Sequence, residues 1–185
     1  MKEMKKLEWE IFRLGVSDTI YRYILPPYLK GFSIKYPELR IRIRNGTSGE
    51  LEDMLLGREV DLVVGFRPNR MEDMEFFHLM TLHEVFVVSK EYRRKLPKLL
   101  TAENIYLAKM MMLDEKSQTR KQIDAHLLLQ GIELHPQVEL ANYELLSDLS
   151  KEGLGVAILA RELVEDLEVL PSDIDLPTRE VGVYY

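Results

Sequence analysis

Cysteine is absent from the 185-residue chain, which excludes disulfide scaffolds, thiolate metal sites and cysteine nucleophiles. Long apolar runs are absent as well. The run at 154–160 is interrupted by Gly155 and is far shorter than the roughly 20 residues that a membrane-spanning helix needs. Glu8, Glu10 and Arg13 interrupt the window in which a signal peptide carries its apolar region. We therefore expect no membrane segment, no secretion signal and a cytoplasmic location.

Basic residues are outnumbered by acidic ones, 25 against 31, and the formal net charge is -6. Because DNA phosphates require a basic face, this balance argues against a chain that grips DNA by itself. It does not exclude an acidic domain that is tethered to a separate DNA-binding domain. With 46% hydrophobic and 30% charged residues, the composition is that of a folded globular protein, and the length suggests one domain or two small lobes.

Catalytic and metal-binding patterns are also missing. The sequence has no G-x-S-x-G elbow, no P-loop and no H-E-x-x-H motif. His78 and His83 are five residues apart, which fits no usual zinc pair, and His126 and His135 flank a predicted turn. Asp61 could be a buried acid, although a strand-entry residue bonded to nearby amides is the better explanation. We expect no catalytic residue, no metal ion and no cofactor.

Strand and helix patterns alternate along the chain. In the first part, hydrophobic spacing predicts strands at 12–17, 41–44 and 61–66 and helices at 20–36 and 47–58. The first helix should start or bend at Pro26-Pro27. Later spacing predicts strands at 84–89, within 105–113, and at 137–140, 155–159, 169–170 and 181–185, with helices at 119–130, 143–152 and 161–166. This alternation indicates an α/β fold with mostly parallel sheets.

Two helix starts carry polar residues at the spacing of a capping box: Thr47 with Glu50, and Thr119 with Gln122. Each helix follows a strand, and open α/β sheets bind ligands at the carboxyl ends of their strands. A helix N-terminus presents free N–H groups that suit an anion, although a single capping box most often only caps its helix. Ser17 adds a hydroxyl after the first strand, so these groups together could converge on one small polar molecule.

Two further stripes each have two interpretations. Arg40, Arg42 and Arg44 alternate with isoleucine and could bind phosphate, but a solvated sheet face or a charged edge strand fits the alternation better. The three methionines at 110–112 could form an adaptable contact surface, but a buried strand is the better interpretation.

The order of the motifs resembles the effector-binding domain of LysR-type transcriptional regulators, over residues 11 to 185 or nearly the whole chain. The resemblance rests on LGVSDT at 14–19, LPPYL at 25–29, F-x-x-x-YP at 32–37, GTSGEL at 46–51 and L-x-G-x-x-x-DL at 55–62. It continues with SQTR at 117–120, QGI at 130–132 and GLGVAIL at 153–159. Each motif is short, but their order and spacing together are specific. Asp18 departs from the family, which often has proline at this position.

The resemblance implies a type 2 periplasmic-binding-protein-like fold, with two Rossmann-like lobes around a central cleft. Lobe one would comprise 11–80 and 161–185, lobe two 81–160, and 1–10 would be a linker remnant. The winged helix-turn-helix that the family carries upstream is absent from this chain. A small anionic effector would lie between the lobes, and its contacts, carried over by motif, are Ser17, Thr47, Ser48, Phe66, Arg67, Ser117, Thr119 and Asn142.

The partners follow from the same resemblance. DNA would be bound only through the missing N-terminal domain, and the chain would form a homodimer, with a higher oligomer in the full-length protein. Candidate dimer residues are Tyr21, Tyr28, Lys35, Gln122, His126 and Gln130. The alternative is a stand-alone solute-binding protein of the same fold that serves transport. A secretion signal would favour that alternative, and an enzyme would need a nucleophile–base pair, which the motifs do not offer.

Overall fold

A computed structural model of the chain describes residues 11–70 and 72–185. The predicted linker remnant at 1–10 therefore lies outside the described residues. Contacts divide the chain into two compact units. Of the described residues, those up to Met80 together with Glu180–Tyr185 form unit 1, and Thr81–Arg179 form unit 2. Among the described residues, no helix is long and apolar enough to cross a membrane.

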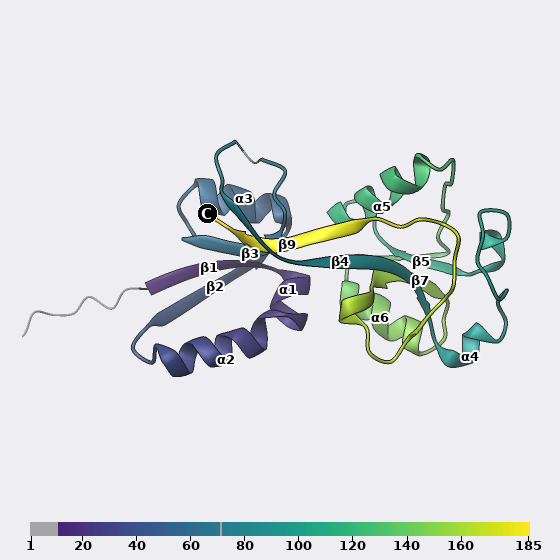
Figure 1. Cartoon of the computed structure of the whole chain (residues 1–185), viewed down its shortest axis with the longest axis horizontal. Coiled ribbons are helices and arrows are strands. Elements are labelled where there is room, and N and C mark those ends of the chain that lie inside the picture. Colours follow the sequence, from purple (N-terminus) through teal and green to yellow (C-terminus); the bar gives the residue numbers. More distant parts are fainter. Residues whose placement is uncertain (1–10, 71) are drawn as a thin grey trace, which may run out of the picture. The chain divides into compact units, whose positions relative to one another are not determined.

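Unit 1 is built on a sheet in which β1 (Ile11–Ser17) pairs in parallel with β2 (Arg40–Gly46) and with β3 (Leu62–Phe66). The end of β9 (Thr178–Tyr184) pairs antiparallel with β3. Helix α3 (Ser48–Leu56) covers one face of this sheet, and α1 (Asp18–Tyr23) and α2 (Leu25–Lys35) lie on the other (Figure 1). Leu51 of α3 packs against Val63 of β3 and Tyr184 of β9 in the core.

The break between α1 and α2 lies where the prolines predicted it. Ile24 ends α1, and Pro26 occupies the first turn of α2, where a missing backbone N–H removes no helical hydrogen bond. Strand β2 is an edge strand on which Arg42 and Arg44 are exposed while Ile43 is half-buried. The structure therefore supports the edge-strand interpretation of the arginine stripe.

Unit 2 contains a mixed sheet with the strand order β4-β7-β5-β6. Strand β4 (Phe76–Val88) begins in unit 1 and, within unit 2, pairs antiparallel with β7 (Val156–Ala160) and β8 (Glu168–Val169). Strand β5 (Met110–Leu113) pairs in parallel with β6 (Val138–Leu140) and β7. The α/β class is confirmed, with more antiparallel pairing than the sequence predicted. The remaining elements are α4 (Lys90–Arg93), η1 (Ile105–Leu107), α5 (Gln118–Leu128), α6 (Tyr143–Lys151) and η2 (Arg161–Leu163).

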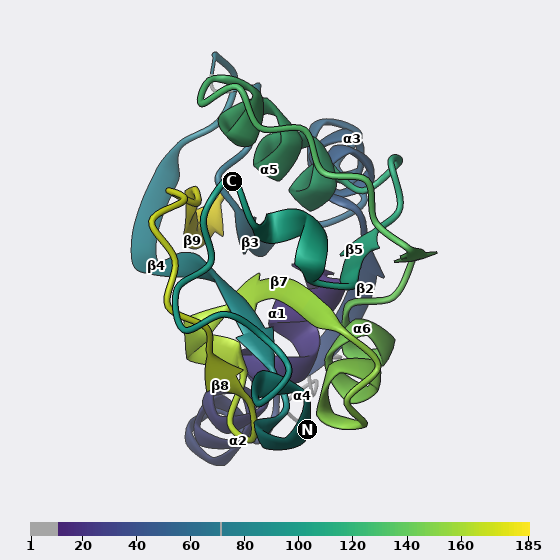
Figure 2. The same cartoon turned by 90° about the vertical axis from the view of Figure 1, so that its right-hand side faces the viewer.

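The methionines of β5 are buried on both faces of the unit 2 sheet. Met110 and Met112 pack in the same cluster as Ile123 of α5, whereas Met111 packs in another cluster with Leu146 of α6. Helices α5 and α6 lie on opposite faces of the sheet (Figure 2). Since alternate residues of a strand point to opposite faces, three consecutive methionines fill two core layers. The buried-strand interpretation is therefore confirmed.

The family resemblance implies that residues 161–185 belong to the first lobe, but the structure places 161–179 in unit 2 and only Glu180–Tyr185 in unit 1. Val169 of β8 pairs with Val87 of β4, and Leu170 and Ile174 are buried in the main core of unit 2. These apolar side chains hold the segment there, so the chain leaves unit 2 only after Arg179. The helix predicted at 161–166 is also wrong, because only the short 3-10 turn η2 forms there.

Candidate functional site

Three parallel strands of unit 1 end at one edge of its sheet, where the sequence placed five of the candidate residues. Ser17 ends β1 and pairs in register with Gly46, the last residue of β2. Thr47 and Ser48 follow directly at the start of α3, and Phe66 and Arg67 stand at the exit of β3. Because carboxyl ends of parallel strands share an edge, the structure brings these five residues to the same side of unit 1.

The Ser17 hydroxyl is the most distinctive group at this edge. The side chain is buried, and its Oγ has no hydrogen-bond partner among the described residues. Ser17 precedes α1 but makes no side-chain capping bond to it. A buried hydroxyl without a partner is costly, so Ser17 is suited to exchange a hydrogen bond with a bound molecule.

The predicted capping box at α3 is confirmed. The Glu50 N–H donates to Thr47 Oγ1 at 3.4 Å, and the Thr47 N–H donates to Glu50 Oε2 at 2.8 Å. The bonds from the Thr47 backbone and hydroxyl lower the pKa of Glu50. The Thr47 hydroxyl donates its proton to Glu50 at 2.9 Å, whereas Ser48, the first helical residue, takes no part in the box. Ser48 is therefore better suited than Thr47 to a ligand contact.

Arg67 directly follows β3, and its charge is already matched by the carboxylate of Glu180. Its Nη1 donates to Glu180 Oε2 at 2.8 Å, its backbone N–H donates to the Glu180 carbonyl at 2.9 Å, and its guanidinium lies 5.3 Å from the centre of the Phe76 ring. Phe66 is half-buried beside it. The ion pair makes Arg67 a weaker anion partner than its sequence position suggested.

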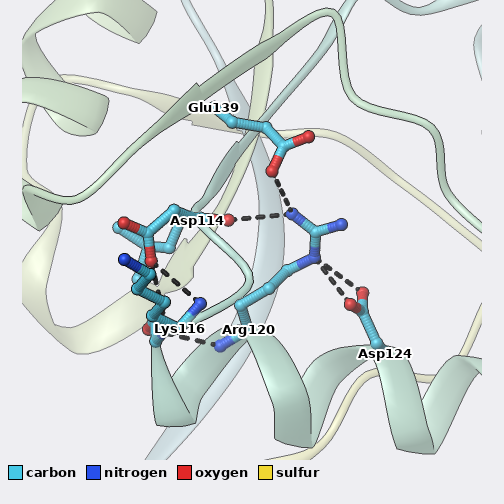
Figure 3. Close-up of polar contacts among 7 residues, drawn as sticks. Asp114, Lys116, Arg120, Asp124 and Glu139 are labelled. Atoms are coloured by element: carbon cyan, nitrogen blue, oxygen red, sulfur yellow. Dashed lines mark hydrogen bonds and ion pairs between the residues drawn. The ribbon is translucent and has the colours of Figure 1, made fainter.

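In unit 2, the parallel strands β5 and β6 end side by side, with Leu113 paired to Leu140. The chain after β5 turns sharply because Asp114 Oδ1 accepts the N–H groups of Lys116 and Ser117, both at 3.1 Å (Figure 3). Ser117 then caps α5 by accepting the Arg120 N–H at 3.4 Å. The predicted capping box at Thr119 is therefore wrong. Thr119 is instead the second helical residue, because the Asp114 turn places the cap at Ser117, two residues before Thr119.

Asn142 follows β6 and caps α6, since its Oδ1 accepts the Leu145 N–H at 2.9 Å. The next residue, Tyr143, accepts the Ala160 N–H at its hydroxyl, at 2.8 Å, which ties the start of α6 to the end of β7. Asn142 is exposed, so its side-chain amide can still donate outward. Ser117, Thr119 and Asn142 thus lie at the strand ends of unit 2.

Sequence reasoning missed a buried arginine that fixes this edge. Arg120 donates from Nη1 to the Leu113 carbonyl at 2.8 Å and to Glu139 at 3.4 Å, and from Nε to Asp124 at 2.7 Å (Figure 3). The guanidinium joins the first turn of α5 to the ends of β5 and β6. A helical arginine followed by an aspartate four residues later looks like a surface pair in sequence, so no local pattern predicts its burial.

Sequence reasoning also missed the partners of Thr119. Arg179 Nη1 donates to Thr119 Oγ1 at 2.8 Å, and Arg179 Nε donates to Glu84 Oε1 at 2.7 Å. All three residues belong to unit 2. Burial raises the pKa of Glu84, and the Arg179 guanidinium opposes that effect. A glutamate directly before the apolar run 85–88 was the one signal in the sequence.

Across residues 11–70 and 72–185, no cluster of three or more histidine, aspartate or glutamate side chains is arranged to hold an ion. Two histidines face single carboxylates: His83 lies 2.6 Å from Glu162, and His126 lies 2.8 Å from Asp175.

Comparisons with known proteins agree with this architecture. The family model described as LysR substrate binding domain matches residues 10–185. Among curated relatives, the uncharacterized HTH-type transcriptional regulator YeiE of Escherichia coli (strain K12) is 28% identical over 155 residues, covering 83% of this chain and 52% of the relative. YvbU of Bacillus subtilis (strain 168), also named an uncharacterized HTH-type transcriptional regulator, is 27% identical over 156 residues, covering 84% and 52%. The chain thus spans about half the length of these relatives.

Solved structures show the same fold. The regulatory domain of Synechocystis PCC6803 CcmR in complex with 2-PG matches with a TM-score of 0.79 at 20% identity, covering 95% of this chain and 86% of that one. The effector binding domain of QuiR in complex with shikimate matches with a TM-score of 0.76 at 16% identity, with the same coverage.

Proposed function

Because this chain belongs to the LysR substrate binding domain family, we propose that it senses a small effector molecule on behalf of a transcriptional regulator. The observation that carries the proposal is the buried hydroxyl of Ser17, which has no hydrogen-bond partner in the described part of the chain and lies at an edge where three parallel strands end. The names of the relatives support it, since YeiE and YvbU are HTH-type regulators. The solved domains of CcmR and QuiR, named as complexes with 2-PG and shikimate, support a small ligand.

The effector we propose is anionic. The helix starts after β2, β5 and β6 supply N–H donors and hydroxyls, which suit carboxylate or phosphate oxygens. Arg67 and Arg179 are already paired with Glu180 and Glu84, so these donors would provide most of the recognition. The proposed contacts are Ser17, Thr47, Ser48, Phe66 and Arg67 of unit 1 and Ser117, Thr119 and Asn142 of unit 2.

The signal would leave the domain as a population shift. Effector contacts made in one conformation and not in another change the balance between the two. In the full-length protein, a helix-turn-helix domain outside this chain would convert that balance into DNA binding in the cytoplasm. The stand-alone solute-binding protein remains the weaker alternative, because the matched relatives are named as transcriptional regulators. We propose no enzymatic activity.

We also propose a homodimer, on the basis of charge on the two edge strands. Edge strand β2 of unit 1 exposes Arg42 and Arg44. Edge strand β6 of unit 2 borders a hollow of about 440 Å³ whose lining includes Glu115 and Glu133, as well as Asp124 and Glu139, which are already paired with Arg120. A second copy would therefore find complementary charge. In sedimentation velocity, Arg42→Glu and Glu133→Arg, both at exposed positions, should each weaken self-association, and their combination should restore it. Monomers at every concentration would contradict the dimer.

The sensing proposal is tested by a thermal-shift screen of the chain against a library of metabolites, followed by ¹H–¹⁵N NMR titration of each stabilising compound. We expect at least one carboxylate or phosphate ester to raise the melting temperature and to shift the amides of Ser17, Ser48 and Thr119. A library in which no compound stabilises the chain, or binders that shift only remote amides, would contradict the proposal.

A further inference from the structure

The hydroxyl of Thr119 accepts a hydrogen bond from a buried guanidinium. Arg179 Nη1 donates to Thr119 Oγ1 at 2.8 Å, and Arg179 is 5% exposed. Arginine has no acceptor atom, so the threonine oxygen can only accept in this contact. The single proton of the hydroxyl must then point away from Arg179. Thr119 can therefore offer a bound molecule a hydrogen-bond donor.

Glu84 keeps the guanidinium in place. Its Oε1 accepts from Arg179 Nε at 2.7 Å and lies 2.6 Å from Nη2, and Glu84 is 4% exposed. Contacts to two guanidinium nitrogens fix the plane of the group as well as its position. Nη1 therefore points at Thr119. The guanidinium cannot turn toward a ligand, whereas an arginine without such contacts could.

Thr119 itself sits where the backbone also presents donors. It is the second residue of the 11-residue helix α5, whose cap, Ser117, accepts the Arg120 N–H. The N–H groups of Gln118 and Thr119 belong to the first turn, which has no intrahelical acceptors for them. The Thr119 hydroxyl and the backbone N–H groups beside it therefore all present hydrogen-bond donors.

We propose that Arg179 and Glu84 are positioning residues that fix the Thr119 hydroxyl as a donor, so that the effector must present a hydrogen-bond acceptor there. This inference rests on the proposed effector site. The acceptor would be an oxygen of a carboxylate, a phosphate or a carbonyl group. An ammonium or other donor-only group is rejected, because it would face donors from both the side chain and the backbone. The buried pair is neutral overall, so it selects by hydrogen-bond polarity more than by charge.

The test compares six compounds by ¹H–¹⁵N NMR titration of the whole chain: acetate, glycolate, shikimate, inorganic phosphate, ethylammonium and putrescine. Among these, the compounds that shift the amides of Gln118, Thr119 and Arg120 should all be anions with acceptor oxygens.

The affinity of the tightest-binding compound is then measured for the parent chain and for variants. Thr119→Ser keeps the hydroxyl and should bind within about twofold of the parent. Thr119→Val should bind about five- to tenfold more weakly, the cost of one lost hydrogen bond. Thr178→Val, at an exposed neighbour of Arg179, is the matched control and should bind as the parent does.

A double-mutant cycle separates positioning from a purely structural role. Glu84→Leu combined with Arg179→Met removes both charges together, which avoids leaving one buried ion unpaired. In this background, Thr119→Val should cause no further loss of affinity, because the hydroxyl is no longer oriented. If Thr119→Val lowers the affinity by the same factor in the parent and in the Glu84→Leu, Arg179→Met background, the inference is overturned. Full affinity in Thr119→Val alone would overturn it too. Either result would leave effector sensing intact. The same holds if ethylammonium or putrescine shifts these amides. If neither these compounds nor a metabolite library binds the chain anywhere, effector sensing fails, and this inference fails with it.

Discussion

Arg179 of β9 lies 2.6 Å from Glu84 of β4, and both side chains are almost fully buried. One oxygen of Glu84 has no hydrogen-bond partner among the described residues. The pair joins two strands far apart in the sequence inside unit 2. A buried ion pair of this kind is far more sensitive to the loss of one partner than to the loss of both.

The first prediction concerns this pair. Glu84→Leu alone leaves a buried guanidinium without its counter-charge and should lower the free energy of unfolding by about 3–5 kcal/mol. Glu84→Leu with Arg179→Met should recover most of that loss, because no charge then remains buried. Urea unfolding followed by circular dichroism measures both. Equal losses in the single and the double variant would show that the charges are not coupled.

The second prediction compares two glycines. A Cβ at Gly182 of β9 would overlap the Phe77 carbonyl oxygen and the Phe76 ring, whereas a Cβ at Gly31 of α2 meets no atom within 4 Å. Gly182→Ala should cost more than about 2 kcal/mol through overpacking, and Gly31→Ala should add about 0.5–1 kcal/mol through helix propensity. Thermal unfolding of the two variants shows whether Gly182→Ala lowers the stability and Gly31→Ala raises it. A tolerated Gly182→Ala would mean that the β9 backbone can move away from Phe77.

The sequence predicted those parts of the fold that depend on local pattern. Alternation and capping chemistry located β1, β2 and α3, and Pro26 marked the break between α1 and α2 because proline acts on its own backbone. The predictions of the fold are wrong where contacts between residues far apart in the sequence determine the structure. Residues 161–179 join unit 2 because Leu170 and Ile174 find their core there, which no local window can show.

The candidate site divides in the same way. Thr47 and Glu50 form the predicted capping box because both partners lie within one turn. The start of α5 was misplaced because Asp114, three residues before Ser117, organises the turn. The buried Arg179 was missed because its partners are 95 and 60 residues away in the sequence.

The third prediction concerns pH. Asp61 accepts hydrogen bonds from the Arg13 backbone N–H at 2.7 Å and from Arg13 Nη2 at 2.6 Å, and these bonds lower the pKa of Asp61. An acid whose folded-state pKa is lowered stabilises the fold above its unfolded pKa, near 3.9 for aspartate. That contribution disappears as the pH falls through the lowered value.

Asp61→Asn should therefore reduce stability at pH 7 by roughly 0.5–1 kcal/mol, a small effect because the pair is partly exposed. The difference from the parent should shrink as the pH falls below about 4. Urea unfolding at several pH values measures it, with Asp166→Asn, at an exposed aspartate, as the control. A difference that is constant from pH 7 to pH 3 would contradict the assignment.

The fourth prediction separates the two hydroxyls at the start of α3. Thr47→Ala removes a capping side chain and should cost about 1 kcal/mol of stability. Ser48→Ala should cost only a few tenths of a kcal/mol, because Ser48 takes no part in the capping box. Equal losses in thermal unfolding would show that the capping role is shared.

The central proposal is that an effector molecule contacts the side chains of Ser48 and Thr119. Calorimetric titration of the compound identified by the metabolite screen into the parent, Ser48→Ala and Thr119→Ala tests this claim most directly. Ser33→Ala, at an exposed position of α2, serves as the control. We predict that Ser48→Ala and Thr119→Ala each weaken binding by about 1–3 kcal/mol, since each leaves a buried polar group of the ligand unmatched. Binding to both variants as tight as to the parent and to Ser33→Ala would contradict the claim and leave these residues with structural roles alone.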